Sequence, residues 1–207
     1  MRLISISDTH NQHHNIEIPK GDILIHCGDF TEGGTKQEIE NFLRWFSKQP
    51  HTHKILIAGN HDFYLEKYAT DIGNIFPSDI HYLKDSGITI ENFKIWGSPY
   101  TPGNGNWAFN LERGRSIRKK WNLIPQNTDL LITHTPPYGI LDESKTYKNI
   151  GCEELLKQIV DIKPKLHFFG HVHDDFGKKN IGPTLFVNSA VMDSRNRLIN
   201  GISVVEI

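Results

Sequence analysis

Cysteine is scarce in this chain: only Cys27 and Cys152 occur among its 207 residues. This scarcity leaves room for one disulfide at most, and both residues lie near apolar segments, a context that favours buried, reduced thiols. A Cys27–Cys152 disulfide is the alternative. Because reduced thiols are typical of cytoplasmic proteins, that is the compartment we expect.

Long apolar runs and an excess of either charge are missing as well. No apolar run approaches the roughly 20 residues that span a bilayer, so a membrane protein is not expected. The seven residues before Asp8 are too few and too quickly followed by polar ones for a signal peptide. The formal net charge of −1 gives no electrostatic reason to expect nucleic acid or a membrane surface as a partner.

What the chain does have is a series of short apolar runs rich in Ile, Leu, Val and Phe. Several lack period-2 alternation, which favours strands buried on both faces. Strands are predicted at residues 3–7, 22–27, 54–58, 87–96, 129–133, 165–169, 184–187 and 201–207. Helices are predicted after a cap at Thr35, over 114–121 and over 153–162.

The order of these elements predicts the fold class. Strands alternate with helices in the first part, which gives βαβ units and a largely parallel sheet, so the class is α/β. The C-terminal part is strand-rich with short turns, and a second sheet is therefore expected. The sequence has no repeat, low-complexity tract or linker, and 207 residues suffice for a sizeable core. We predict a single domain over residues 1–207.

Five short blocks of metal-capable side chains each follow an apolar run. The blocks are Asp8-Thr9-His10, Gly28-Asp29, Gly59-Asn60-His61-Asp62, Thr133-His134 and Gly170-His171-Val172-His173. Loops after the carboxyl ends of strands are where open α/β folds bind ligands. Carboxylate and amide oxygens suit hard cations, imidazole suits transition metals, and one carboxylate can bridge two ions. The blocks together predict a centre for two adjacent cations.

Each block alone has an ordinary structural explanation. A single D-x-H or G-D in a loop is usually solvated, and a lone histidine such as His134 is usually structural. The occurrence of five blocks in this order outweighs those explanations. The other histidines do not share the context, and we assign them to the surface or core, with His26 as a core imidazole. They are His13, His14, His26, His51, His53, His81 and His167.

The order D-x-H, G-D, G-N-H-[DE], H, G-H-x-H resembles the calcineurin-like metallophosphoesterase superfamily over nearly the full length of the chain. Further segments resemble its metallophosphoesterase-domain subgroup more closely. They are residues 7–11, 21–26, 28–32, 57–61, 107–110, 120–125, 131–137 and 169–173. The resemblance implies a four-layer αββα sandwich of two mixed sheets flanked by helices. It also implies two metal ions and phosphoester hydrolysis, mainly of diesters in this subgroup.

The same resemblance implies a role for each matching residue. One ion would bind Asp8, His10, Asp29 and His173, and the other Asp29, Asn60, His134 and His171. Asp29 would bridge the two ions, and the ligand set is compatible with Mn, Fe, Zn, Ni or Co. A water activated between the ions would attack phosphorus, with His61 as general acid or phosphate partner. Glu32 would orient His61, and a solvated loop charge is its alternative.

The surroundings of the blocks favour diesters over monoesters. No arginine follows the G-D or G-N-H block, whereas a dianionic monoester is well recognised by a bidentate arginine. Arg113 or Arg115 could still supply that charge, although the basic run from Arg113 to Lys120 is also explained as a solvated helix face.

One segment is a candidate substrate wall. Trp107 and Phe109 could stack on a nucleobase while Asn110 reads its edge. The alternative is that both aromatic residues only anchor a loop. We expect a small phosphodiester or nucleotide as substrate, and the sequence leaves the oligomeric state open.

Two rival functions follow from the same residues. A nuclease or phosphomonoesterase of this superfamily is the first, but the chain offers little of the basic surface that a nuclease uses. A non-catalytic scaffold that retains the fold is the second. Such relatives tend to lack the His61 equivalent or a metal ligand, and both are intact here.

Overall fold

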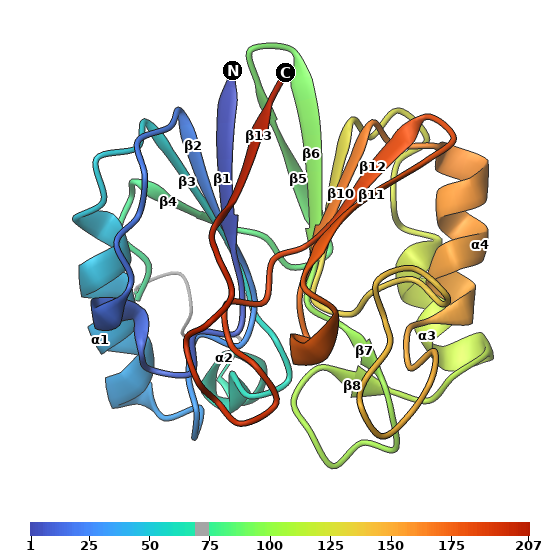
Figure 1. The fold of residues 1–207 in the computed structure, drawn as a ribbon, viewed down its shortest axis with the longest axis horizontal. Coiled ribbons are helices and arrows are strands. Elements are labelled where there is room, and N and C mark those ends of the chain that lie inside the picture. The colour runs from blue at the N-terminus through green and yellow to red at the C-terminus, as the bar shows by residue number, and fades with distance from the viewer. Residues whose placement is uncertain (69–74) are drawn as a thin grey trace.

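Two mixed β-sheets form the centre of the computed structural model, which describes residues 1–68 and 75–207 (Figure 1). Within those residues the first sheet contains β1 (Arg2–Ile6), β2 (Ile23–Cys27), β3 (His53–Ile57), β4 (Ile80–Tyr82) and β13 (Ser203–Glu206). The second contains β5 (Ser86–Ile90), β6 (Phe93–Ser98), β9 (Leu130–Thr133), β10 (Leu166–Phe169), β11 (Gly177–Ile181) and β12 (Thr184–Asn188). A small ladder pairs β7 (Thr101–Pro102) with β8 (Asn110–Leu111).

Helices lie against these sheets and at the strand ends. They are α1 (Lys36–Ser47), α2 (Phe63–Lys67), α3 (Arg115–Trp121) and α4 (Glu153–Ile162), with the 3-10 turns η1 (His13–Asn15) and η3 (His173–Asp175). Helix α1 begins as predicted at Thr35, whose hydroxyl accepts the N–H of Glu38 in a reciprocal capping box. The predicted helices over 114–121 and 153–162 are confirmed as α3 and α4.

Each sheet is mainly parallel with antiparallel strands at its margin. The first has the order β13-β1-β2-β3-β4, in which only β13 runs antiparallel to its neighbour. The second has the order β11-β12-β10-β9-β6-β5, in which β5 and β11 run antiparallel to theirs. Parallel pairing aligns the carboxyl ends of β1, β2 and β3 at one edge, and those of β9 and β10 at an edge of the other sheet.

Three apolar clusters separate four layers. One joins the inner faces of the two sheets, for example Ile25 and Ile55 with Ile132 and Phe168. The second packs α1 on the outer face of the first sheet, and the third packs α3 and α4 on the outer face of the second. The predicted four-layer αββα sandwich is confirmed (Figure 1). Burial on both faces explains why these strands lack alternation.

The predicted strand over 87–96 is wrong in one respect, because it is a hairpin of β5 and β6. Its two turn residues, Glu91 and Asn92, have positive φ angles of 48° and 68°. Two successive residues of this kind make the tight turn that suits twisted antiparallel strands. The sequence signal was weak because the turn uses Glu-Asn instead of a glycine.

The two cysteines are free and buried, so the predicted disulfide alternative is wrong and the expected thiols are confirmed. Among the described residues, no helix is long and apolar enough to cross a membrane. The termini lie side by side at the top of Figure 1, and the loops after β1, β2 and β3 lie at the opposite end. That opposite end holds the residue blocks singled out by the sequence.

Candidate metal centre

The backbone at several block residues adopts the left-handed conformation that side chains other than glycine rarely take. Asp8, His10, Asp29 and His171 have φ angles of 57°, 38°, 55° and 69°. Backbone hydrogen bonds between the loops after β1 and β2 hold two of them: the N–H of Asp8 donates to Gly28 O, and that of His10 donates to Asp29 O. Such conformations cost free energy and concentrate at functional sites, so the fold constrains where these side chains point.

Two glycines let the carboxylates approach neighbouring backbone closely. A Cβ on Gly59 would collide with the carboxylate of Asp29, and a Cβ on Gly170 would collide with that of Asp8. Any larger residue at either position would displace the carboxylate. The glycines in the G-N-H and G-H-x-H blocks therefore leave room for the two carboxylates.

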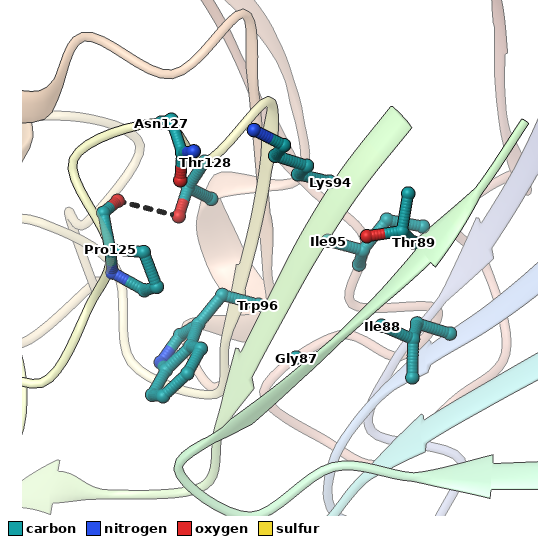
Figure 2. A pocket seen from close by; sticks show the side chains of 9 residues that line it. All are labelled: Gly87, Ile88, Thr89, Lys94, Ile95, Trp96, Pro125, Asn127 and Thr128. Carbon is teal, nitrogen blue, oxygen red and sulfur yellow. Dashed lines mark hydrogen bonds between the residues drawn. The ribbon is translucent and has the colours of Figure 1, made fainter. Parts of the chain in front are cut away.

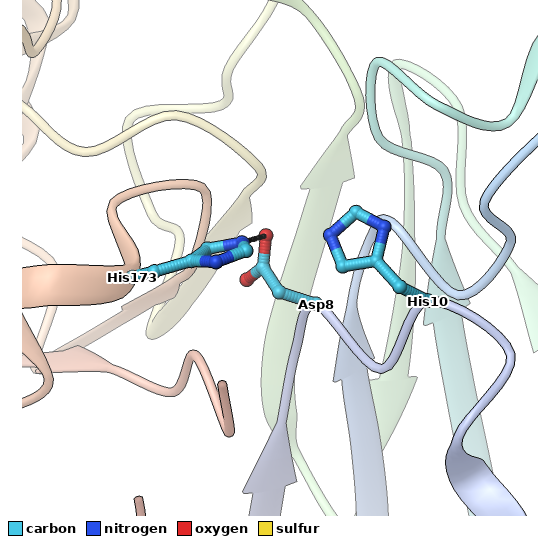
Figure 3. A group of neighbouring side chains, drawn as sticks. All are labelled: Asp8, His10 and His173. Carbon is cyan, nitrogen blue, oxygen red and sulfur yellow. Dashed lines mark ion pairs between the residues drawn. The ribbon is translucent and has the colours of Figure 1, made fainter. Parts of the chain in front are cut away.

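The first cluster contains Asp8, His10 and His173, whose ligating atoms lie within 4.8 Å of one another (Figure 3). Asp8 is fully buried, and its Oδ1 lies 3.4 Å from Nε2 of His173. The backbone N–H of His171 donates to Asp8 Oδ2 at 2.9 Å. That bond fixes the carboxylate between the first and last blocks of the sequence.

The second cluster contains Asp29, His134 and His171 within the same limit. Nε2 of His134 lies 3.1 Å from Asp29 Oδ2 and 3.1 Å from Asn60 Oδ1. The rings of His134 and His171 are 5.0 Å apart between centroids. The structure thus brings together all seven residues that the sequence offered as ligands.

Three histidines have an outer nitrogen that faces an acceptor. Nδ1 of His134 donates to the carbonyl of Cys27 at 2.8 Å, and Nδ1 of His173 donates to that of Asp193 at 3.1 Å. Nδ1 of His10 lies 3.2 Å from Oε2 of Glu32. In each case Nε2 is left for the cluster, which is the arrangement of metal-ligating imidazoles.

The two carboxylates and two of the histidines shift one another's pKa. Burial would raise the pKa of Asp29, but the charge and hydrogen bond of His134 outweigh it and hold that pKa below its ordinary value. Burial would lower the pKa of His134, and Asp29 outweighs it and raises that pKa to about 9. Asp8 has the same effect on His173, whose pKa rises to about 9 despite burial. A bound cation would compete with these protons for the same nitrogen atoms.

The donor set suits transition-metal cations. It combines two buried carboxylates with an amide oxygen and four imidazoles. Neither ring nitrogen of the buried His10 has a hydrogen bond in the described part of the chain. A buried polar side chain in that state calls for a partner, and a cation at Nε2 would be one.

His61 lies against both clusters. Its backbone N–H donates to Asp29 Oδ1 at 2.8 Å, and its ring centroid lies 4.6 Å from that of His10. Its Nδ1 donates to the carbonyl of Glu32 at 2.9 Å. The predicted contact between Glu32 and His61 therefore exists, but it uses the backbone of Glu32 and not its carboxylate.

Of the predicted substrate wall, only Trp107 borders the clusters. Trp107 is 47% exposed, and its ring centroid lies 4.7 Å from that of His61 and 5.9 Å from that of Phe63. Phe109 is fully buried and packs on Tyr100, which matches the alternative of a loop anchor.

Two further residues that were predicted to contact substrate form hydrogen bonds with the protein's own backbone instead. The amide of Asn110 donates to Thr101 and accepts the N–H of Gly105. The guanidinium of Arg113 donates to the carbonyls of Ile150 and Gly151 at 2.8 Å each. Of the residues predicted to form the wall, Trp107 is the one whose ring packs on His61.

Asp62 is a supporting residue to which sequence reasoning gave no role. Its buried carboxylate accepts the backbone N–H groups of Asp29, Gly59 and Thr31, and also the hydroxyl of Thr31. It therefore joins the second and third blocks. Its place in the G-N-H-[DE] block was the available signal.

Four of the histidines outside the blocks are buried, namely His13, His26, His51 and His167. His26 is fully buried with Nε2 3.0 Å from the hydroxyl of Thr9, as predicted for a core imidazole. His167 is also fully buried, with Nε2 2.8 Å from the hydroxyl of Thr133. Burial lowers the pKa of each to about 3, so both are neutral near pH 7.

A separate pocket of about 350 Å³ lies on the β5–β6 hairpin (Figure 2). It is lined by residues 87–89 and 94–96 of the hairpin together with Pro125, Asn127 and Thr128. None of its lining residues belongs to either ligand cluster. The pocket is therefore separate from the candidate metal centre.

Comparison with known proteins agrees with this geometry. The sequence model for calcineurin-like phosphoesterases matches residues 1–175. Metallophosphoesterase domain-containing protein 1 of Homo sapiens is 37% identical, and the match covers 100% of this chain and 71% of that protein. UPF0046 protein K07C11.7 of Caenorhabditis elegans is 36% identical over 96% of this chain and 72% of that protein.

A solved structure shares the fold. Phosphopantetheinyl hydrolase (PptH) from Mycobacterium tuberculosis superposes with a TM-score of 0.63 at 15% identity, over 94% of this chain and 90% of that one. At that identity the likeness concerns the fold alone.

The chain therefore belongs to the calcineurin-like phosphoesterase family. Within that family it is similar to the metallophosphoesterase domain-containing proteins, and the resemblance drawn from the sequence blocks is confirmed. Membership gives the general class, a metal-binding phosphoester hydrolase, and the clusters of His and Asp are able to hold divalent cations.

Proposed function

We propose that this protein is a dimetal phosphodiesterase that hydrolyses small nucleotide-type phosphodiesters. One observation carries the proposal: His61 lies against two clusters of ligating side chains at once. It donates its N–H to Asp29 of one cluster, and its ring packs on His10 of the other. A proton-transfer group beside two cation sites is the arrangement that phosphoester hydrolysis needs.

The ligand assignment follows the two clusters. We assign Asp8, His10, Asp29 and His173 to one ion and Asp29, Asn60, His134 and His171 to the other, with Asp29 shared. When bound, two such ions lower the pKa of a water and neutralise phosphoryl oxygens. Mn, Fe, Zn, Ni and Co all accept this mixture of nitrogen and oxygen ligands.

His61 is the proposed general acid. Because its Nδ1 donates to the carbonyl of Glu32, Nε2 is the nitrogen left to give a proton to the leaving oxygen. A positioned acid of this kind accelerates a reaction by roughly 10²–10⁴-fold. Asp29 accepts the backbone N–H of His61 and, in the proposed assignment, also binds both ions. Asp29 therefore fixes the distance between the general acid and the two cations.

Diesters are favoured because Arg113, one of the two arginines offered as a monoester clamp, is occupied elsewhere. Arg113 holds two carbonyl groups, and Arg197 is paired with Asp193. A singly charged diester needs such a clamp less than a dianionic monoester does. The half-exposed ring of Trp107 beside His61 supports an aromatic group, such as a nucleobase, on the substrate.

The rival functions have weaker support. A nuclease would require a basic groove, and the net charge of −1 does not favour one. A non-catalytic scaffold would not need His61 in this position.

We also propose that the chain forms one domain, which the shared apolar cluster between the sheets supports.

The proposal is tested by hydrolysis of bis(p-nitrophenyl) phosphate and p-nitrophenyl phosphate after chelation and addition of Mn²⁺. We expect metal-dependent turnover that is faster for the diester, and a loss of roughly 10²–10⁴-fold for His61→Ala. Absence of metal-dependent turnover in the wild type would refute the proposed enzymatic activity. Faster monoester hydrolysis would instead overturn the choice of substrate.

A further inference from the structure

The carboxylate of Glu32 lies beside a metal-ligand histidine and not beside His61. We propose, resting on the function above, that Glu32 is a positioning residue for His10: the charge of its carboxylate beside Nδ1 keeps the proton of the neutral ring on that nitrogen, so that an unprotonated Nε2 faces Asp8 and His173. Its negative charge thereby increases the affinity of the first cluster for its cation.

The geometry of His10 carries this inference. His10 is 7% exposed, and Oε2 of the Glu32 carboxylate lies 3.2 Å from its Nδ1. Figure 3 shows the other ring nitrogen directed toward Asp8 and His173. One nitrogen of the ring therefore faces the carboxylate and the other faces the cluster.

The loop that carries Glu32 is fixed on both sides. The N–H and hydroxyl of Thr31 donate to Asp62 Oδ1, and the N–H of Gly33 donates to Glu38 Oε1 at 3.0 Å. The carbonyl of Glu32 itself accepts Nδ1 of His61. Because the backbone is held in place, only the side-chain torsions of the half-exposed Glu32 must be ordered to reach His10.

A carboxylate on the outer nitrogen has two physical effects on a ligating imidazole. It selects the tautomer with a free Nε2 and it makes that nitrogen a better electron donor. Loss of such a partner typically lowers metal affinity by roughly 10–100-fold. Because a glutamine at this position keeps an acceptor oxygen but loses the charge, it should produce part of that loss, and alanine more.

A third cation held among His10, Glu32 and His61 is the competing explanation, since their ligating atoms lie within 4.8 Å of one another. That site would use Nδ1 of His10, the atom that the proposal gives to a proton. The two explanations differ in their need for His61, which is a ligand in one and absent from the other.

The experiment is calorimetric titration of the chelator-treated full chain with Mn²⁺, which needs no turnover. We expect Glu32→Gln to weaken one of two sites by about tenfold, and Glu32→Ala by up to about 100-fold. Glu40→Gln removes an equivalent charge from α1 and should bind as the wild type does. The same Glu32→Gln factor should appear in a His61→Ala background, since the carboxylate acts on His10.

Several results would overturn the proposal. They are unchanged Mn²⁺ affinity in Glu32→Gln and Glu32→Ala, an effect that disappears in the His61→Ala background, and a third Mn²⁺ that is lost with Glu32. Two bound Mn²⁺ ions without phosphodiesterase activity would instead refute the proposed function and leave the role of Glu32 intact. A wild type that binds no Mn²⁺ would refute both.

Discussion

Oδ2 of Asp29 lies 3.1 Å from Nε2 of His134, while Oδ1 of the same carboxylate accepts the N–H of His61. Asp29 is in turn held by its own N–H, which donates to the buried Asp62. One carboxylate thus joins a ligand cluster to the proposed general acid. The family resemblance assigns Asp29 as the residue shared by both cations, and its position between His134 and His61 is compatible with that assignment.

Asp29→Asn should therefore damage both cation sites at once. Asparagine keeps an oxygen that can accept the N–H of His61 but loses the charge and one of the two ligating oxygens. We expect both Mn²⁺ affinities to fall by at least about tenfold, the loss that even an indirect partner of a ligand causes. Calorimetric titration measures both Mn²⁺ affinities. Asp8→Asn is the matched control and should weaken Mn²⁺ binding mainly at one site. An Asp29→Asn protein in which one of the two Mn²⁺ affinities is unaltered would exclude Asp29 as a shared ligand.

Trp107→Ala should weaken binding of substrates that carry a base. Stacking is worth about 1–3 kcal/mol per base, so we expect KM to rise roughly 5–150-fold for a nucleoside p-nitrophenyl phosphate. Methyl p-nitrophenyl phosphate, which lacks a base, should change less, and Trp107→Phe should retain most of the binding. Equal effects on the two esters would show that the indole does not recognise the base.

Stability should fall on mild acidification because of His167. Burial depresses the pKa of His167 from 6.5 to about 3, so between these values the unfolded chain binds a proton that the folded chain does not. Above pH 6.5 the imidazole is neutral in both states and does not change the free energy of unfolding with pH. Below pH 6.5 the free energy of unfolding falls, by about 2 kcal/mol at pH 5.

The matched variant is His167→Gln, which can still donate to Thr133. Urea unfolding of both proteins at pH 7.5 and pH 5 isolates the contribution of His167, since other groups titrate equally in the two. The wild type should lose about 2 kcal/mol more than the variant over this range. Equal losses would mean that His167 is not a neutral buried imidazole.

The fold and the ligand set were predictable because they rest on local patterns. Apolar runs gave the strands, the cap at Thr35 gave α1, and the blocks after the strands gave the seven candidate ligands. Parallel strands bring such blocks to one edge whatever the details of packing. The family resemblance added the pairing of ligands into two sites, which spacing alone does not determine.

The rest depended on tertiary contacts that leave no local signal. A glutamate in a loop gives no indication that its carboxylate lies beside His10 and its carbonyl beside His61. Aromatic residues two apart gave no sign that Trp107 would be exposed and Phe109 buried. The β5–β6 turn was missed because Glu91 and Asn92 replace the usual glycine.

The most direct test of the dimetal proposal is to count bound Mn²⁺ while following hydrolysis of bis(p-nitrophenyl) phosphate. Chelator-treated protein is titrated with Mn²⁺, and bound metal and turnover are measured at each step. We predict that full turnover requires two Mn²⁺ ions per chain and that chelation abolishes it. Full turnover with a single ion, or no diester hydrolysis with two ions bound, would contradict the account.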